Sequence, residues 1–208
     1  MVITDPALLK GREALTVCRA AVRGGATMIQ VRWKDGSASD LLALARVLAV
    51  SLPVPVLVND RVDVALAAQA AGAHLGQDDL PAAAIRPHLP PGFVLGTSVG
   101  SAQEAARARQ WPVDYWSIGP CHGTANKPDA GPPLGPEGFA ALARLAPAGL
   151  PVIGIGGIGP ANATAIMRAG ATGVAVIGAV LGAGDAETAA RSIRTALGSG
   201  FDSRSAAP

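Results

Sequence analysis

The chain has 208 residues, of which 50% are apolar, 15% charged and 3% aromatic. This length suits one domain with a sizeable core, and the composition argues against intrinsic disorder, a coiled coil and a nucleic-acid platform built on base stacking. The formal charge of +2 comes from scattered Lys and Arg residues with no basic run, so a surface that coats DNA or RNA is not indicated.

The cysteines and the apolar stretches favour a reduced, cytoplasmic protein without a membrane segment. Cys18 and Cys121 lie far apart, without the spacing of a zinc site or a disulfide framework. The first residues, MVITDP, lack the basic and apolar segments of a signal peptide. The uncharged stretch 145–167 could span a bilayer by its length, but its three prolines and five glycines predict buried strands and turns instead.

Along the chain, an apolar β-branched segment is repeatedly followed by a turn and then by a segment rich in Ala, Leu and Arg at helical spacing. The predicted strands are, in chain order, 1–4, 27–32, 54–58, 73–75, 93–97, 115–118, 151–155 and 173–177. The predicted helices between and after them include 13–23, 40–50, 62–71, 103–109, 136–145, 161–169 and 186–197.

Strands such as VPVLV and PVIGI are continuous apolar runs, as expected for parallel strands covered by helices. Eight such units predict an α/β protein, a single (β/α)8 TIM barrel over residues 1–197, and an open doubly wound sheet is the alternative. Residues 198–208 are expected to form a flexible C-terminal tail. The long irregular stretch 119–136 follows the sixth strand and is expected to be functional.

In both folds, ligands bind at the C-terminal ends of the strands, and this chain carries unusual polar residues there. Gln30, Arg32 and Lys34 end the second strand at a spacing of two, which directs their side chains to one side of an extended segment. Lys34 and Lys127 are two of only three lysines, and both follow predicted strands. They are interpreted as functional cations, with ordinary solvated loop residues as the alternative.

Carboxylates follow the third and fourth strands, in Asn59-Asp60 and in Gln77-Asp78-Asp79. Carboxylates at neighbouring strand ends commonly hold Mg²⁺, with phosphate and water supplying the remaining ligands. Helix N-capping is the alternative, because each acid precedes a predicted helix or a proline. Capping is sufficient to explain each acid taken alone.

Glycines mark the ends of the last two strands, in GIGGIG at 154–159 and in Gly178. Loops after strands seven and eight of a barrel often bind phosphate through backbone N–H groups, although a tight turn would also require glycine. The chain therefore suggests a cationic, metal-capable site suited to a diphosphate and a second site suited to a monophosphate. Together they predict two phosphorylated substrates and a departing diphosphate.

The order and spacing of these motifs make the sequence resemble the thiamine-phosphate synthase family over essentially the whole chain. The matching motifs are Gln30-Val31-Arg32-Trp33-Lys34, Val58-Asn59-Asp60, GAHLGQDD at 72–79, Gly96-Thr97-Ser98, Gly119-Pro120 with Thr124 and Lys127, and the segment 154–158. The resemblance implies a (β/α)8 barrel that joins a hydroxymethylpyrimidine diphosphate to a thiazole phosphate. The products would be thiamine monophosphate and diphosphate, formed by loss of diphosphate and capture of the pyrimidine cation by the thiazole nitrogen.

The resemblance also implies a role for each matching residue. The pyrimidine diphosphate would be held by Gln30, Val31, Arg32, Trp33, Lys34, Asn59, Ser98 and Lys127. Of these, Lys127, Lys34, Arg32 and Ser98 would act on the departing diphosphate. One Mg²⁺ would be held by Asp60 and Asp79. The thiazole phosphate would be held by Thr124, Ala125, Asn126, Gly157, Ile177 and Gly178.

The chain departs from the family pattern at Asn126, where a second threonine is usual, and at Gly178, where serine is usual. Both departures remove side-chain contacts from the thiazole phosphate site and leave its backbone contacts. His122 is either a substrate contact or a solvated loop residue, and His74 is expected to be structural or on the surface. Trp33 is expected to face away from Arg32 and Lys34, beneath a helix.

Two other functions share this fold. A paralogous thiazole tautomerase would not require the paired acids, and a non-catalytic phosphate-binding barrel would be expected to have lost Asp60, Asp79 or Lys127. The expected partners are small phosphorylated substrates, with no nucleic acid or membrane. The oligomeric state stays open, as does the choice between the thiazole phosphate and its carboxylated form.

Overall fold

Eight parallel strands pair in sequence order from first to last in one sheet. The strands are β1 (Val2–Ile3), β2 (Ile29–Val31), β3 (Val56–Asn59), β4 (Gly72–Leu75), β5 (Val94–Val99), β6 (Tyr115–Ile118), β7 (Val152–Ile155) and β8 (Gly173–Ala175). The computed structural model of the chain describes residues 1–124 and 131–198. The predicted site residues Ala125, Asn126 and Lys127, and tail residues 199–208, lie outside this part.

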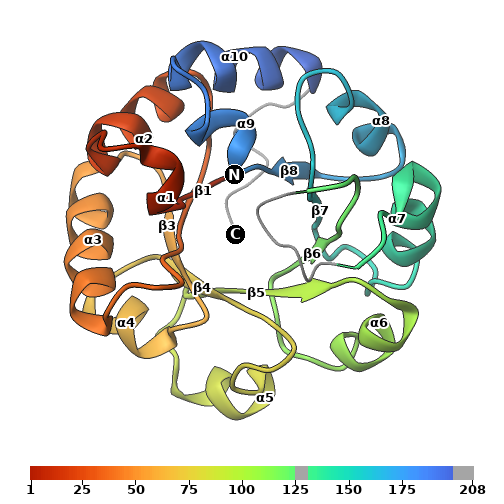
Figure 1. Cartoon of the computed structure of the whole chain (residues 1–208). Coiled ribbons are helices and arrows are strands. Elements are labelled where there is room, and N and C mark those ends of the chain that lie inside the picture. Colours follow the sequence, from red (N-terminus) through yellow and green to blue (C-terminus); the bar gives the residue numbers. More distant parts are fainter. Residues whose placement is uncertain (125–130, 199–208) are drawn as a thin grey trace.

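The sheet closes on itself between its first strand and the residues just after β8. Val2 forms a parallel bridge with Val176. On either side of it, the Ile3 N–H donates to the Val176 carbonyl at 2.9 Å and the Val176 N–H donates to the Met1 carbonyl at 3.1 Å. Figure 1 shows the resulting ring of strands. The predicted (β/α)8 barrel is confirmed, and the open doubly wound sheet is excluded.

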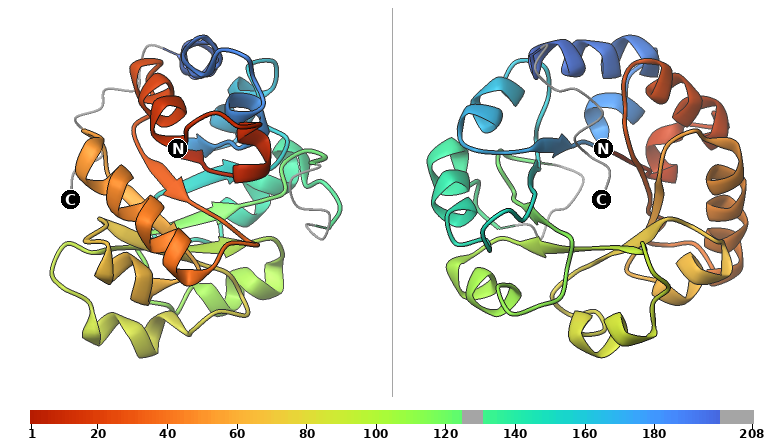
Figure 2. Two further views of the ribbon diagram at one scale, coloured as in Figure 1. Left: turned by 60° about the vertical axis from the view of Figure 1, so that its left-hand side comes forward. Right: turned by 180° about the vertical axis from the view of Figure 1, so that it is seen from behind.

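The helices form an outer ring around the strands (Figures 1 and 2). They are α1 (Pro6–Leu9), α2 (Ala14–Arg23), α3 (Ala38–Ser51), α4 (Val62–Ala67), α5 (Ala82–Ile85), η1 (Arg86–His88), α6 (Ala102–Ala108), α7 (Gly135–Ala143), α8 (Ala163–Arg168), α9 (Gly178–Leu181) and α10 (Ala186–Ala196). Each of the seven predicted helices is present. The helix predicted over 62–71 ends earlier, because Gln69 adopts a left-handed φ of 54°.

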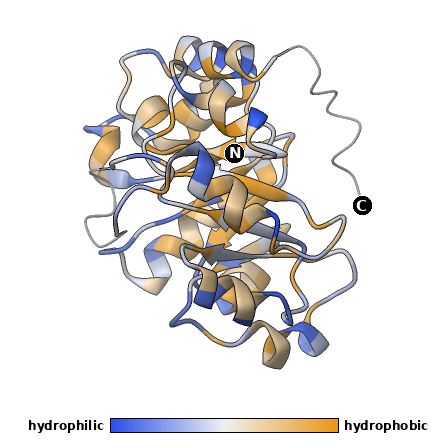
Figure 3. Cartoon of the chain, turned by 90° about the vertical axis from the view of Figure 1, so that its right-hand side faces the viewer, coloured by the Kyte–Doolittle hydropathy of each residue, from blue (hydrophilic) through white to orange (hydrophobic). Residues whose placement is uncertain are grey.

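Alternate residues of each strand contribute to two separate layers. Val56 and Val58 of β3 belong to the apolar cluster that also contains helix side chains, such as Leu41 and Leu48 of α3. Leu57, between them, is buried on the opposite side, inside the barrel. The same alternation places polar side chains inside the barrel at the C-terminal ends of several strands. Figure 3 shows the apolar character of the strands beneath the more polar helices.

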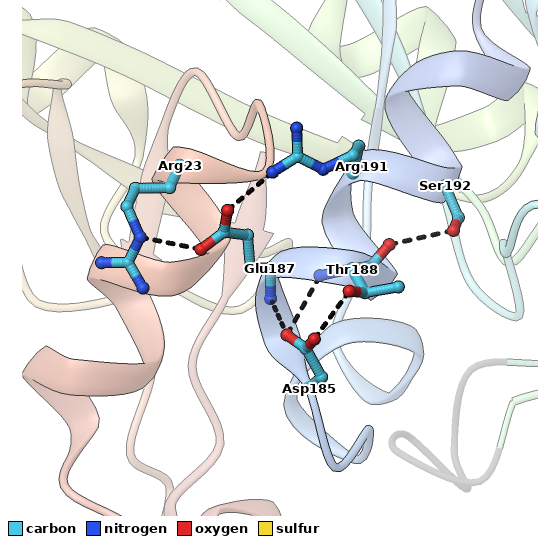
Figure 4. A network of polar contacts seen from close by, with 6 residues as sticks. All are labelled: Arg23, Asp185, Glu187, Thr188, Arg191 and Ser192. Carbon is cyan, nitrogen blue, oxygen red and sulfur yellow. Dashed lines mark hydrogen bonds and ion pairs between the residues drawn. The ribbon is translucent and has the colours of Figure 1, made fainter.

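Helices α2 and α10 pack closely where the ring of helices closes. Glu187 of α10 accepts from Arg23 of α2 at 2.8 Å and from Arg191 at 2.6 Å (Figure 4). The Asp185 side chain caps α10 by accepting from the backbone N–H groups of Glu187 and Thr188. Burial of the facing apolar sides of α2 and α10 is expected to dominate the stability of this contact, because exposed ion pairs contribute little.

The two helices approach closely at Gly24, where an added Cβ would overlap the Glu187 carbonyl oxygen. We expect Gly24→Ala to lower the free energy of unfolding by about 1–3 kcal/mol, because α10 must move away from α2 to admit the methyl group. Urea denaturation would measure this. Gly184→Ala is the matched control, since no atom lies within 4 Å of the added Cβ. Equal effects of the two substitutions would contradict the proposed close packing.

Among the residues that the structure describes, no helix has the length and apolar character needed to cross a membrane.

Candidate active site

A cavity of about 870 Å³ opens at the C-terminal ends of the strands. Segments that end or follow all eight strands contribute to its lining, from Ile3 of β1 to Ala179 of α9. The predicted site residues that line it are Gln30, Arg32, Lys34, Asn59, Asp60, Asp79, Ser98, Thr124, Gly157, Ile177 and Gly178. The fold therefore brings residues from distant parts of the sequence to one barrel mouth.

On one side of the cavity, Gln30, Arg32 and Lys34 project from the end of β2. The Arg32 guanidinium pairs with Asp5 at 3.3 Å, and the Arg32 N–H donates to the Thr4 hydroxyl at 2.9 Å. The Thr4 hydroxyl in turn donates to the Arg32 carbonyl at 3.1 Å. These contacts from the end of β1 fix Arg32, whereas Lys34 is exposed at the mouth.

The side chains of Val31 and Trp33, which alternate with these three, point away from the cavity. Val31 is fully buried in the apolar cluster between strands and helices, and Trp33 packs partly buried against the same cluster. Any contact of these two residues with a ligand in the cavity would therefore come from the backbone. The spacing of two along an extended segment accounts for both sets of directions.

The carboxylates of Asp60 and Asp79 lie at the ends of the neighbouring strands β3 and β4. Asp60 adopts a left-handed φ of 64°, and its N–H donates to the His74 carbonyl at 2.7 Å. The Asp79 carboxylate accepts from the Gly76 N–H at 2.6 Å. Asp78, the neighbouring acid, is exposed.

Helix capping does not account for either carboxylate. Arg61 occupies the N-cap position of α4 and Pro81 that of α5, and neither makes a side-chain capping bond. Over residues 1–124 and 131–198, no group of three or more His, Cys, Asp or Glu side chains is placed to hold a metal. Two carboxylates in a cavity that can admit phosphorylated ligands suit Mg²⁺, which takes one or two protein carboxylates and completes its shell with phosphate and water.

The floor of the cavity contains a histidine that the sequence did not identify as part of the site. His74 is only 6% exposed, and its Nε2 lies 2.9 Å from the Ser98 hydroxyl. Its Nδ1 lies 2.9 Å from the Tyr115 hydroxyl. His74 therefore lies inside the barrel and not on the surface. The sequence signal that could have identified His74 is its position between Ala73 and Leu75. The side chains of these two neighbours face the helices, so the side chain between them faces the barrel interior.

At the opposite side, the loop after β7 packs against the loop after β6. Gly156 and Gly157 have φ values of 95° and 59°, which favour glycine. The Cys121 N–H donates to Ile155 at 2.7 Å, and the His122 N–H donates to Gly156 at 3.0 Å. An added Cβ at Gly157 would lie 2.8 Å from the Cβ of half-buried His122. The glycines are thus required by the turn and also leave this wall of the cavity open.

Comparisons with known proteins agree with this arrangement. A family model described as "Thiamine monophosphate synthase" matches residues 1–180. The chain is 48% identical over 212 residues to a thiamine-phosphate synthase of Roseiflexus sp. (strain RS-1), covering 99% of this chain and 88% of that one. It is 45% identical over 187 residues to a protein of the same name from Moorella thermoacetica, covering 88% of each.

The solved structures give the same result. A thiamine phosphate pyrophosphorylase from Pyrococcus furiosus superimposes with a TM-score of 0.82 at 35% identity, covering 94% of this chain and 93% of that one. An orotidine 5'-phosphate decarboxylase from Pyrococcus horikoshii, at 15% identity and a TM-score of 0.70, shares the fold alone. Sequence and structure together show that the chain belongs to the thiamine monophosphate synthase family.

Proposed function

We propose that this chain is a thiamine-phosphate synthase, which joins a hydroxymethylpyrimidine diphosphate to a thiazole phosphate and releases diphosphate. The observation that carries the proposal is the pairing of two different anion-compatible walls in one cavity. Arg32, Lys34 and two carboxylates lie toward one side, and the glycine loop at 156–157 lies toward the other. Such a cavity suits a diphosphate and a monophosphate bound close together. The proposed location of the reaction is the cytoplasm.

The proposed reaction begins when the bond between the pyrimidine methylene carbon and the diphosphate oxygen breaks. Arg32, Lys34 and Ser98 donate hydrogen bonds to the departing diphosphate, which takes the bonding electrons and the negative charge that develops. Donors fixed in place before reaction lower the barrier because they need little rearrangement. Arg32 meets this condition through its contacts with Asp5 and Thr4.

The methylene cation left behind is captured by the thiazole nitrogen, which forms the new C–N bond. This step needs orientation and no protein nucleophile, so the chain's contribution is to hold the two substrates face to face. Thr124, Gly157, Ile177 and Gly178 line the wall proposed for the thiazole phosphate. Because Gly178 supplies no hydroxyl, this contact would rest on backbone N–H groups.

Asp60 and Asp79 are the residues proposed to hold Mg²⁺. When bound, the ion would neutralise charge on the diphosphate and make it a better leaving group. The left-handed backbone at Asp60 and the Gly76 N–H bond at Asp79 hold both side chains at the cavity.

The proposed function predicts that purified protein forms thiamine phosphate and one equivalent of diphosphate from the two substrates with Mg²⁺. We expect EDTA to reduce the rate at least about 100-fold and excess Mg²⁺ to restore it, since the ion stabilises the leaving group. Chromatography of thiamine phosphate and an enzymatic diphosphate assay would measure this. Parallel reactions with the thiazole phosphate and its carboxylated form would show which is used.

Reactions lacking one substrate provide the control for diphosphate release without coupling. A folded protein that yields no thiamine phosphate would contradict the proposal. A tautomerase assay and equilibrium binding of phosphorylated ligands would then test the two remaining functions.

A further inference from the structure

A line of polar side chains crosses the interior of the barrel beneath the cavity. Ser98 lies at the cavity, His74 contacts it at 2.9 Å, and Tyr115 contacts the other ring nitrogen of His74 at 2.9 Å. The side chain of Gln30 also acts on the Tyr115 hydroxyl and lowers its pKa. Gln30 and Tyr115 are 2% and 6% exposed, and Gln30, His74 and Ser98 meet the cavity while Tyr115 lies behind them.

The backbone is shaped to allow the central contact. His74, Gly96 and Tyr115 are register partners on the adjacent strands β4, β5 and β6. A Cβ at Gly96 would overlap the phenol ring, so glycine at this level lets Tyr115 reach across β5 to His74. The two rings stack with their centroids 5.6 Å apart and their planes inclined by 28°.

The direction of the hydrogen bonds along this line follows from the chemistry of its members. Burial raises the pKa of Tyr115 well above its ordinary value, so its hydroxyl keeps its proton. Gln30 lowers that pKa, which is the effect of an amide N–H directed toward the phenol oxygen. The Tyr115 proton is then available for Nδ1 of His74.

We propose that Tyr115 is a positioning residue for the proposed reaction: its hydroxyl donates to Nδ1 of His74 and thereby favours the imidazole tautomer that carries its proton on Nε2. In this tautomer the Nε2–H donates to Ser98, and the hydroxyl proton of Ser98 is left to donate to a diphosphate oxygen. In the other tautomer Ser98 donates to Nε2 and presents only lone pairs to the anion. Tyr115 thus determines whether Ser98 attracts or repels the leaving group.

The decisive variant is Tyr115→Phe, which keeps the ring and removes the hydroxyl. Nitrogen-15 NMR of histidine-labelled protein distinguishes the two tautomers directly, and His88→Gln and His122→Gln variants would identify the signal of His74. We expect the wild type to show protonated Nε2 and Tyr115→Phe to show a mixture of both tautomers. The same substitution should lower kcat about tenfold, the effect of one buried hydrogen bond.

Two further variants separate positioning from packing. Thr97→Val removes another buried hydroxyl from the helix-facing side of β5, where it donates to the Leu75 carbonyl, and should leave the His74 tautomer unchanged. In a Ser98→Ala background, Tyr115→Phe should cause no further loss of kcat, because its effect passes through the serine. Thermal unfolding of each variant would establish that it is folded.

An unchanged tautomer in Tyr115→Phe would overturn the inference, as would additive losses of kcat in the double variant. A changed tautomer with unchanged kcat would overturn the catalytic role. The inference rests on the proposed function for its kinetic part only. If wild-type protein made no thiamine phosphate, the proposed function and that kinetic part would fail, while the NMR would still decide the hydrogen bond.

Discussion

Asp60→Asn is expected to lower kcat for thiamine phosphate formation about 100-fold or more while the protein stays folded. The substitution removes one of the two carboxylates proposed to bind Mg²⁺, and loss of the ion forfeits several kcal/mol of stabilisation of the departing diphosphate. Asparagine tolerates the left-handed φ of 64° at this position better than alanine does, so the backbone should be retained. Steady-state rates over a Mg²⁺ titration, with urea denaturation alongside, would measure both effects.

Asp78→Asn is the matched control for charge. Asp78 lines the same cavity and is exposed, as Asp60 is, but only Asp60 and Asp79 are proposed ligands, and the carboxylate of Asp79 is held by the Gly76 N–H. We therefore expect Asp78→Asn to retain most of the activity and Asp79→Asn to lose it. Equal losses in Asp78→Asn and Asp60→Asn would indicate a general effect of negative charge at the mouth. Full activity in Asp60→Asn would contradict the proposed metal ligand.

Lys34→Met is expected to lower kcat by about 10²–10³ because it removes a cationic donor from the leaving group. Lys34 lies at the mouth of the cavity, exposed and at the end of the segment that begins with Gln30. Its replacement by methionine leaves no buried group without a partner, so the free energy of unfolding should change by less than about 0.5 kcal/mol. Inhibition by added diphosphate gives a second measurement, because Lys34→Met should weaken it.

Lys10→Met is the matched control, since Lys10 is an exposed lysine at the C-cap of α1 and does not line the cavity. We expect this variant to keep wild-type kcat and wild-type inhibition by diphosphate. If Lys34→Met behaved like Lys10→Met in both measurements, Lys34 would be an ordinary solvated loop cation.

Most of the barrel was predictable because its strands carry a strong apolar signal and all except β4 are followed by a helix of six residues or more. The one-turn helices α1, α5 and α9 were not predicted, because four residues are too few to show helical periodicity. Their ends depend on local contacts, such as the Asp5 side chain that accepts from the Ala7 N–H.

Within the candidate site, the spacing of two predicted which side chains of 30–34 reach the cavity. The partners that hold them were not predictable from local sequence. Thr4 and Asp5 meet Arg32 because β1 pairs with β2 in the sheet, a pairing between segments more than 20 residues apart. His74 was missed for a related reason, since its partners Ser98 and Tyr115 come from two other strands.

Tyr115 is the single tyrosine of the chain. Fluorotyrosine incorporated during expression would therefore give one fluorine resonance, located in the barrel interior and separated from the cavity by His74. Displacement of Ser98 or His74 by a bound ligand would shift that resonance. Binding to the cavity could then be followed with one substrate alone, in a complex that cannot react.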